Sequence, residues 1–159
     1  MNSLSIDHVI LVVSDLLVAS QQFSQLGFTV ISGGVHSGGL THNALVPFPD
    51  GTYLELLSTT RSSRLKLLSF MKSLRLLGIY IGDDTAINRR LTTDLAGGIG
   101  IADFCMVSGD LEKEINLLET RGAQFTAPIP GGPRPPGIGK RYIHRKSLFS
   151  EYTCTVYEF

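Results

Sequence analysis

The chain contains a degenerate internal repeat, and this repeat narrows the folds that are open to it. Residues 8–16 read against residues 103–111 at a constant offset of 95 positions, and residues 53–56 resemble the closing residues 156–159. The offset aligns three pairs of chemically distinctive residues: His8 with Asp103, Asp15 with Asp110, and Gly27 with Gly122. Self-similarity at a fixed offset indicates that one supersecondary unit occurs twice. We therefore expect functional residues where the two copies meet.

Length and charge narrow the class of protein. A chain of 159 residues buries about 70% of its unfolded surface, enough for one compact domain or two closely packed modules. The 14 basic and 14 acidic residues cancel, so no net field attracts nucleic acid or an anionic membrane, and we expect neither partner. No apolar run reaches the length of a membrane span, and the first residues lack the basic segment of a signal peptide. A cytoplasmic protein is expected.

The cysteine content does not support a disulfide framework. Cys105 and Cys154 are the two cysteines of the chain, and both lie in apolar, strand-like runs. Buried free thiols are therefore the expected state of both residues.

The first half reads as a βαβββ module. Residues 5–13 are rich in β-branched residues and predict a strand, and Ser14-Asp15 follows as a helix N-cap. Apolar residues then recur at helical spacing until Gly27 ends the helix. Three more strands are predicted at residues 28–32, 42–48 and 52–57, with a flexible loop bounded by Gly33-Gly34 and Gly38-Gly39 and a turn at Pro49-Asp50-Gly51.

The second half repeats this order. The predicted elements are a strand at 101–107, an N-cap at 108–110, a helix ending at Gly122, and strands at 123–127, 141–146 and 152–158. Residues 128–139 are rich in Pro and Gly and are interpreted as a mobile flap.

A helical linker is predicted between the two halves. Ser62–Leu77 has apolar residues at helical spacing: Leu65, Leu68, Met71, Leu74 and Leu77. This pattern predicts an amphipathic helix with Arg64, Lys72 and Arg75 outside. The resulting boundaries are a first module at 1–58, a helical linker at 59–97 and a second module at 98–159, within one compact domain.

Four strand positions carry candidate metal ligands. His8 corresponds to Asp103 in the repeat, and Glu55 corresponds to Glu158. A buried carboxylate needs a partner. If the three carboxylates and the imidazole at these matching positions converge, a bound divalent cation would be the partner of all four. Nitrogen and oxygen donors suit Zn, Mn, Fe, Ni or Co, and three carboxylates favour harder ions such as Mn or Mg. The alternative is that Asp103 turns outward or pairs with an Arg.

The other histidines are weaker candidates. His42 opens a strand directly after the Gly-rich loop, where it could serve as a ligand, a general base or a hydrogen-bond donor to substrate. An ordinary polar residue on an edge strand is the alternative. His36 is interpreted as loop surface, and His144, on a basic strand, as a candidate pocket residue.

Other common motifs are absent. The sequence has no Gly-x-Ser-x-Gly, Cys-x-x-Cys or His-Glu-x-x-His motif, so nucleophilic hydrolase chemistry has no support. Gly97-Gly98-Ile99-Gly100 precedes a strand and opens no helix, which is not the context of a phosphate-binding loop.

Residues 4–16, with Gly27-Phe28, Thr41–Leu45 and Tyr53–Leu57, resemble the glyoxalase/bleomycin-resistance/extradiol-dioxygenase superfamily, also called vicinal oxygen chelate. Within it, the chain is most similar to the glyoxalase-like group with a Thr-His-Asn-Ala-Leu strand. The resemblance implies an α+β fold in which two βαβββ modules pair curved mixed sheets around a central cavity. It implies metal ligands on the first and last strands of the modules, at His8, Glu55, Asp103 and Glu158. Asp103 departs from the better-known pattern, in which His or another neutral ligand is common.

The resemblance implies several activities. Members of this superfamily perform isomerisation, epimerisation, ring cleavage and epoxide opening, and some only sequester a drug. We expect an enzyme of isomerase or lyase type acting on an oxygenated, largely apolar small molecule, with a divalent metal as Lewis acid and Glu55, His42 and Glu158 as catalytic residues. A metal-free cyclase or isomerase using the cavity carboxylates stays open as an alternative, as does a non-catalytic, ligand-sequestering protein. A homodimer also stays open.

Overall fold

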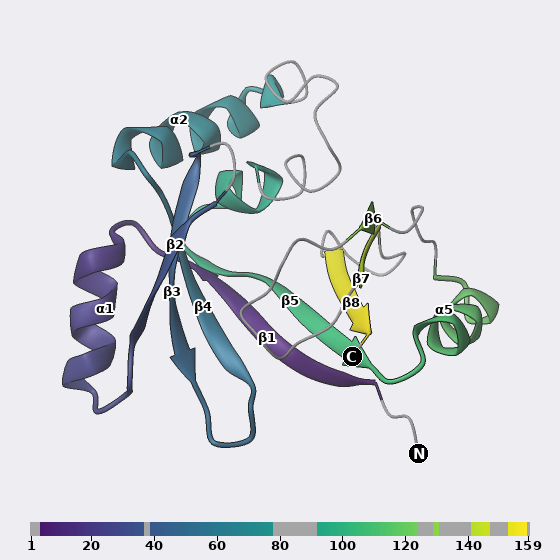
Figure 1. Ribbon diagram of the computed structural model, residues 1–159. Coiled ribbons are helices and arrows are strands. Elements are labelled where there is room, and N and C mark those ends of the chain that lie inside the picture. Colours follow the sequence, from purple (N-terminus) through teal and green to yellow (C-terminus); the bar gives the residue numbers. More distant parts are fainter. Residues whose placement is uncertain are drawn as a thin grey trace. The chain divides into compact units, whose positions relative to one another are not determined.

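Each half of the chain folds in the order βαβββ (Figure 1). The computed structural model describes residues 4–36, 39–77, 92–123, 129–130, 141–146 and 153–158, the last three ranges by backbone alone. The chain divides into two compact units, Met1–His8 with Asp103–Phe159, and Val9–Ala102. The predicted α+β class and the βαβββ repeat are confirmed. The cavity implied by the resemblance stays a prediction.

The elements match most of the predicted ranges. The first half contains β1 (Ser5–Val12), α1 (Leu16–Gln25), β2 (Ile31–Val35), β3 (Thr41–Pro47) and β4 (Tyr53–Thr59). The second half contains β5 (Gly100–Ser108), α5 (Leu111–Thr120), β6 (Ile129–Pro130), β7 (Arg141–Lys146) and β8 (Thr153–Glu158). Between them lie α2 (Ser62–Ser73) and a helical segment at 92–96. The strand predicted at 123–127 and most of the Pro/Gly-rich flap fall outside the described residues.

The repeat is visible in how α1 and α5 begin and end. Asp15 caps α1 by accepting a hydrogen bond from the Val18 N–H at 3.0 Å, and Asp110 caps α5 from the Lys113 N–H at 3.1 Å. These side chains satisfy backbone donors that the first helical turn leaves unpaired. After each helix a glycine takes a left-handed conformation, with φ of 93° at Gly27 and 92° at Gly122. The aligned Asp residues therefore cap a helix, and the aligned Gly residues follow its end, in both halves.

In the unit Val9–Ala102, β2, β3 and β4 form an antiparallel sheet with β3 in the centre. Strand alternation turns one face of this sheet toward α1, and the buried residues there form one cluster: Val13, Ala19, Ala44, Val46 and Leu56. The Val13 N–H donates to the Leu57 carbonyl at 2.9 Å, which ties the end of β1 to β4. Truncating a fully buried leucine such as Leu56 typically costs about 2–5 kcal/mol, so this cluster is a main source of the unit's stability.

The second strand lies three residues later than the sequence predicts. Residues 28–32 were the expected strand, whereas β2 is Ile31–Val35. Phe28 leaves the strand because its ring packs between Phe23 and Phe48, with ring centroids 5.7 and 6.4 Å away. Gly33-Gly34, predicted as loop, are part of the strand, and the ladder to β3 is irregular at this point.

The linker helix is shorter than predicted. α2 ends at Ser73, and Arg75 then adopts a left-handed φ of 58°. Leu65 and Leu68 are buried as expected, but Leu74 is 50% exposed and its predicted place in the apolar stripe is wrong. The 3.6-residue period applies only as far as the helix continues, so it does not position Leu74.

The turn between β3 and β4 is the predicted Pro49-Asp50-Gly51. Gly51 has a φ of 89°, and one Asp50 carboxylate oxygen accepts hydrogen bonds from the Thr52 N–H at 3.0 Å and the Thr52 hydroxyl at 2.7 Å. The hydroxyl of Thr52, followed by its N–H, lowers the pKa of Asp50 below its ordinary value of 3.8. These bonds therefore stabilise the ionised carboxylate of the folded state.

This geometry predicts a pH-dependent contribution to stability. Because the folded pKa of Asp50 is depressed, its stabilisation is present above the unfolded pKa and is lost as the pH falls through the folded pKa. Asp50→Ala should lower the melting temperature near neutral pH, and the difference should vanish in strong acid. Asp50→Asn keeps an acceptor oxygen without the charge, so its difference from wild type isolates the titrating term. Melting curves from about pH 7 to about pH 2 measure both. An equal deficit of Asp50→Ala at every pH would contradict the assignment.

In the other unit, β8 lies between β5 and β7. It is parallel to β5 and antiparallel to β7, and β6 pairs with the far side of β7. Leu111 is buried at the start of α5, with Leu4, Met106 and Ile115 packed around it. Cys105 is buried as predicted, whereas the Cys154 side chain lies outside the described residues. Among the described residues, no helix combines the length and apolar character needed to cross a membrane.

Candidate functional site

One face of the β2–β3–β4 sheet carries Glu55 and Asn43. The register pairs Leu45 with Glu55 and Asn43 with Leu57, so Asn43 and Glu55 are diagonal neighbours on the same face of the antiparallel pair. Diagonal partners at this spacing are within reach of each other's polar ends. The Asn43 amide nitrogen donates to Glu55 Oε1 at 2.7 Å. The sequence-predicted Glu55 is therefore a strand residue with a defined hydrogen-bond donor.

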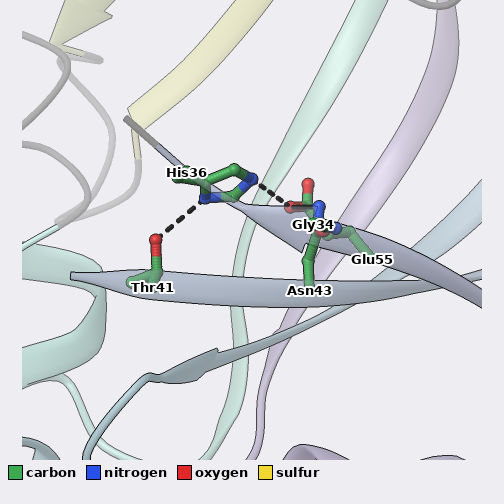
Figure 2. Close-up of polar contacts among 5 residues, drawn as sticks. All are labelled: Gly34, His36, Thr41, Asn43 and Glu55. Atoms are coloured by element: carbon green, nitrogen blue, oxygen red, sulfur yellow. Dashed lines mark hydrogen bonds and ion pairs between the residues drawn. The ribbon is translucent and has the colours of Figure 1, made fainter. Parts of the chain in front are cut away.

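Glu55 is largely removed from water, with 9% of its surface exposed. The His36 Nε2 atom lies 3.6 Å from Glu55 Oε1, the same oxygen that accepts from Asn43 (Figure 2). The His36 side chain keeps 38% of its surface exposed, against 12% for that of Glu55. A small molecule in contact with solvent can therefore reach this imidazole and the edge of the carboxylate, while little bulk water surrounds the carboxylate itself.

Thr41 fixes the other side of the His36 ring. Its hydroxyl oxygen lies 2.8 Å from His36 Nδ1, and Thr41 is fully buried. The backbones of the two residues are also joined, because the His36 N–H donates to the Thr41 carbonyl at 2.9 Å. When the Thr41 hydroxyl donates to Nδ1, the proton of the neutral ring sits on Nε2 and faces Glu55. The ring is thus hydrogen-bonded at Nδ1, while Nε2 lies toward the Glu55 carboxylate.

A β-bulge in β2 accounts for the position of His36. Ser32 pairs with Ala44 and Val35 pairs with His42, so two residues of β2, Gly33 and Gly34, face the single residue Asn43. In a regular ladder of the same length, His36 would be one place out of register, and its side chain would lie on the opposite face of the sheet. The extra residue brings His36 opposite Thr41 and onto the Glu55 face.

The two glycines also contact Asn43. The Gly34 N–H donates to Asn43 Oδ1 at 2.9 Å (Figure 2). A Cβ atom at Gly33 would collide with Asn43 Oδ1 and would lie 2.8 Å from Cγ and 2.9 Å from the Asn43 carbonyl oxygen. A Cβ atom at Gly34 would meet nothing within 4 Å. Only Gly33 is therefore sterically required to be glycine by the side chain of Asn43.

His42, a candidate catalytic residue in the sequence, lies on the other face of this sheet. It pairs with Ser58, in alternation with Asn43 and Leu57, and its face is the one that packs on α1. There it lines an open pocket of about 870 Å³ together with α1 residues such as Leu16, Ser20 and Gln21. The register therefore separates His42 from Glu55, and His36 occupies the place beside the carboxylate.

The other predicted ligands, His8, Asp103 and Glu158, belong to the unit made of Met1–His8 and Asp103–Phe159. His8 is 4% exposed, and its Nδ1 atom lies 2.6 Å from an Asp7 carboxylate oxygen. A carboxylate on one ring nitrogen is the usual way to orient a metal-binding histidine, and it also suits a structural ion pair. Asp103 is 1% exposed, and its Oδ1 accepts from the Phe104 N–H at 2.8 Å. The alternative in which Asp103 turns outward is therefore wrong.

The positions of Glu158 and His144 are described by backbone alone. The β8 register pairs Glu158 with Ser108, and it pairs Thr155 with Cys105. His144 pairs with Thr155 on the other side of β8. Because Ser108 is one residue out of alternation with Cys105, the backbone register does not align Glu158 with the Asp103 and Cys105 positions.

The donor set predicted for a metal is chemically suitable, since imidazole and carboxylate groups bind divalent cations. Among the residues whose side chains the structure describes, no three His, Cys, Asp or Glu side chains gather closely enough to hold an ion. The metal assignment to His8, Glu55, Asp103 and Glu158 therefore stays a prediction, and we derive no step through a metal.

Sequence reasoning placed Glu55 on its strand but missed His36, Asn43 and the glycine pair. Period-two alternation counted through Gly33-Gly34 assigns His36 to the wrong face. A glycine pair inside a strand pattern is a known signal for a bulge, and this signal could have identified His36 as a neighbour of Glu55.

Comparisons with known proteins agree with this architecture. Residues 6–145 match the glyoxalase-like domain. Among solved structures, a hypothetical protein from Staphylococcus aureus is 20% identical with a TM-score of 0.61, covering 97% of this chain. The chain spans only 59% of that protein's length. Among curated proteins, none is similar enough in sequence to count as a match.

Two epimerase structures share the fold. Methylmalonyl-CoA epimerase from Mycobacterium tuberculosis is 16% identical with a TM-score of 0.57, covering 98% of this chain and 88% of that chain. A Streptomyces coelicolor methylmalonyl-CoA epimerase in complex with 2-nitronate-propionyl-CoA is 19% identical with a TM-score of 0.54, covering 98% and 96%. At these identities the likeness shows the fold. The chain therefore belongs to the glyoxalase-like domain family of the glyoxalase and vicinal oxygen chelate superfamily.

Proposed function

We propose that this protein is an isomerase-type enzyme that moves a proton at a carbon next to a carbonyl group, with Glu55 as the proton acceptor. The observation that carries the proposal is the held carboxylate. Glu55 is 9% exposed, accepts a hydrogen bond from Asn43 at 2.7 Å and lies 3.6 Å from the His36 imidazole. General acid–base catalysis needs a titratable group in a fixed position near a second one, with little competing water.

The chemistry requires no redox partner. The carboxylate of Glu55 takes the proton from the carbon, and the electron pair of the broken C–H bond moves onto the carbonyl oxygen to give an enolate. Return of the proton to either face of that carbon restores the carbonyl and leaves the composition of the substrate unchanged. His36 supports this exchange because its Nε2 faces the oxygen of Glu55 that accepts from Asn43.

The ligands named for the structural relatives support this substrate class. A methylmalonyl-CoA epimerase structure contains methylmalonyl-CoA, and a Streptomyces coelicolor structure contains 2-nitronate-propionyl-CoA. A nitronate carries its negative charge on oxygens conjugated to carbon, as an enolate does. Such groups are what a site for proton abstraction next to a carbonyl would bind. We therefore extend to this chain the class of oxygenated, anionic carbonyl compounds.

Cationic residues on α2 fit an anionic substrate. Arg64, Lys66 and Lys72 lie on this helix, whereas residues 1–57 contain no Lys or Arg. A locally positive surface raises the local concentration of anions and their rate of encounter. This charge distribution supports an acidic ligand more than a neutral one.

The test is proton exchange by the full-length protein. In D₂O, the protein should promote incorporation of deuterium next to the carbonyl of methylmalonyl-CoA, or of the smaller methylmalonyl N-acetylcysteamine thioester, as followed by NMR. Exchange should be stereochemically productive, so that a single epimer is converted to both. Tight binding of these thioesters with no exchange above buffer would favour the ligand-sequestering alternative. Neither binding nor exchange would remove the proposed substrate class.

Elemental analysis tests the predicted metal. A divalent ion would act as a Lewis acid and polarise a substrate oxygen when bound. Stoichiometric metal in the purified protein, with loss of exchange on chelation and recovery on re-addition, would support the metal-dependent enzyme. Exchange that is unaffected by chelators in protein free of stoichiometric metal would support the metal-free alternative.

A further inference from the structure

The side chain of Asn43 has one orientation that satisfies its neighbours. An amide oxygen only accepts hydrogen bonds, and an amide nitrogen only donates them. The Gly34 N–H can only donate, so Asn43 Oδ1 must face it, as the 2.9 Å bond shows. The amide nitrogen is then directed to Glu55 Oε1 at 2.7 Å. The Gly34 N–H therefore fixes the amide orientation in which the Asn43 nitrogen donates to the Glu55 carboxylate.

The bulge makes this arrangement possible. In a regular antiparallel ladder, backbone N–H groups alternate between the partner strand and the outer edge, and none is aimed at a side chain of the partner. The extra residue in Gly33-Gly34 disrupts that pattern and leaves the Gly34 N–H to bond the Asn43 side chain. Gly33 leaves space for the amide, because a Cβ atom there would collide with Asn43 Oδ1. The bulge thus provides both the Gly34 N–H donor and the space that the Asn43 amide occupies.

We propose that Asn43 is a positioning residue for Glu55, and that the Gly33-Gly34 bulge holds it in the one orientation that donates to the carboxylate. This inference rests on the proposed function, in which Glu55 accepts the proton. In this assignment the bulge acts on catalysis through Asn43. It assigns a role to Asn43 and Gly33 that differs from general support of the sheet.

The two adjacent glycines provide a matched pair of variants. Gly33→Ala should displace the Asn43 amide, whereas Gly34→Ala keeps its N–H and meets nothing within 4 Å. In the thioester exchange assay, we expect Gly33→Ala to lower kcat about 10- to 100-fold with little change in KM, since a displacement near 1 Å at a catalytic group has effects of this size. Gly34→Ala leaves the N–H that bonds Asn43 in place and should lower kcat far less than Gly33→Ala. Equal effects of the two variants would overturn the proposal.

Variants of Asn43 separate positioning from folding. Asn43→Asp keeps an acceptor for the Gly34 N–H but directs a second carboxylate at Glu55, so kcat should fall at least as far as in Asn43→Ala. The double variant Gly33→Ala/Asn43→Ala removes the side-chain part of the collision. Its melting temperature should lie above that of Gly33→Ala, while its kcat should stay at the level of Asn43→Ala. Recovery of kcat together with stability would show a structural role alone and would overturn the proposal.

A spectroscopic measurement makes the test independent of the substrate. The NMR signals of the Asn43 side-chain amide should shift in Glu55→Gln and in Gly33→Ala, and should shift less in Gly34→Ala. If wild type exchanges none of the thioesters but these shifts occur, the proposed function fails and the positioning contact stands. Unchanged amide signals in Gly33→Ala and Glu55→Gln would overturn the positioning role even in an active enzyme.

Discussion

Glu55→Gln is expected to reduce proton exchange in the methylmalonyl thioesters by about 10²- to 10⁴-fold, the usual contribution of a general base. Gln has the same shape, and its carbonyl oxygen can still accept the hydrogen bond from Asn43. It cannot take up a proton from carbon. The loss should therefore appear in kcat, with the melting temperature and circular dichroism spectrum close to those of wild type.

A second carboxylate provides the control for this variant. Glu112 is an exposed carboxylate in the first turn of α5 and is not one of the residues of the candidate site, so Glu112→Gln removes the same charge at another position in the chain and should leave exchange unchanged. The metal content of Glu55→Gln adds a further distinction. Loss of metal and turnover together would assign Glu55 to a metal site, whereas loss of turnover alone would assign it to acid–base chemistry. Full exchange by Glu55→Gln would withdraw Glu55 as the base.

The fold could be predicted because the sequence signals that define the βαβββ order occur in both halves of the repeat. Asp15 and Asp110 cap helices at aligned positions, and Gly27 and Gly122 follow those helices with the same left-handed backbone. Each signal is local: a side-chain oxygen near the first turn, or a residue without Cβ where φ is positive. Such local signals can be recognised in the sequence alone. Because the same signals occur at aligned positions in both halves, they indicate the βαβββ order without knowledge of tertiary contacts.

The position of Glu55 was equally accessible, but its neighbours were not. Strand alternation and the repeat identify Glu55 as a residue on one face of β4. Asn43 lies beside Glu55 through the register of β3 with β4, whereas the position of His36 depends on how β2 pairs with β3, which is not a local property of the sequence. The sequence pattern predicts a loop at Gly33-Gly34, whereas these residues form a β-bulge in the structure. The extra residue of the bulge places every later side chain of β2 on the opposite face of the sheet from the one that regular alternation predicts. From the sequence, His36 is interpreted as loop surface because the glycines on both sides of it predict a loop.

The strand pattern and the structure differ on which histidine lies beside the Glu55 carboxylate. The strand pattern favours His42, which opens a strand beside a Gly-rich loop, and indicates that His36 is loop surface. The antiparallel register settles where each lies in the sheet, because His42 pairs with Ser58 on the α1 face while the His36 Nε2 atom lies 3.6 Å from Glu55 Oε1.

His36→Gln and His42→Gln are therefore expected to differ strongly. Gln at position 36 retains an amide but has no ring to bridge Thr41 and Glu55, so we expect kcat for thioester exchange to fall about 10²-fold, at the lower end of acid–base contributions. His42→Gln alters the opposite face and should leave kcat within about twofold of wild type, because the His42 side chain does not share a face with Glu55. Parallel pre-steady-state and steady-state exchange rates measure both variants. The reverse order of effects, with His42→Gln impaired and His36→Gln active, would restore the assignment made from the strand pattern and would show that the catalytic face of this sheet is the one that packs on α1.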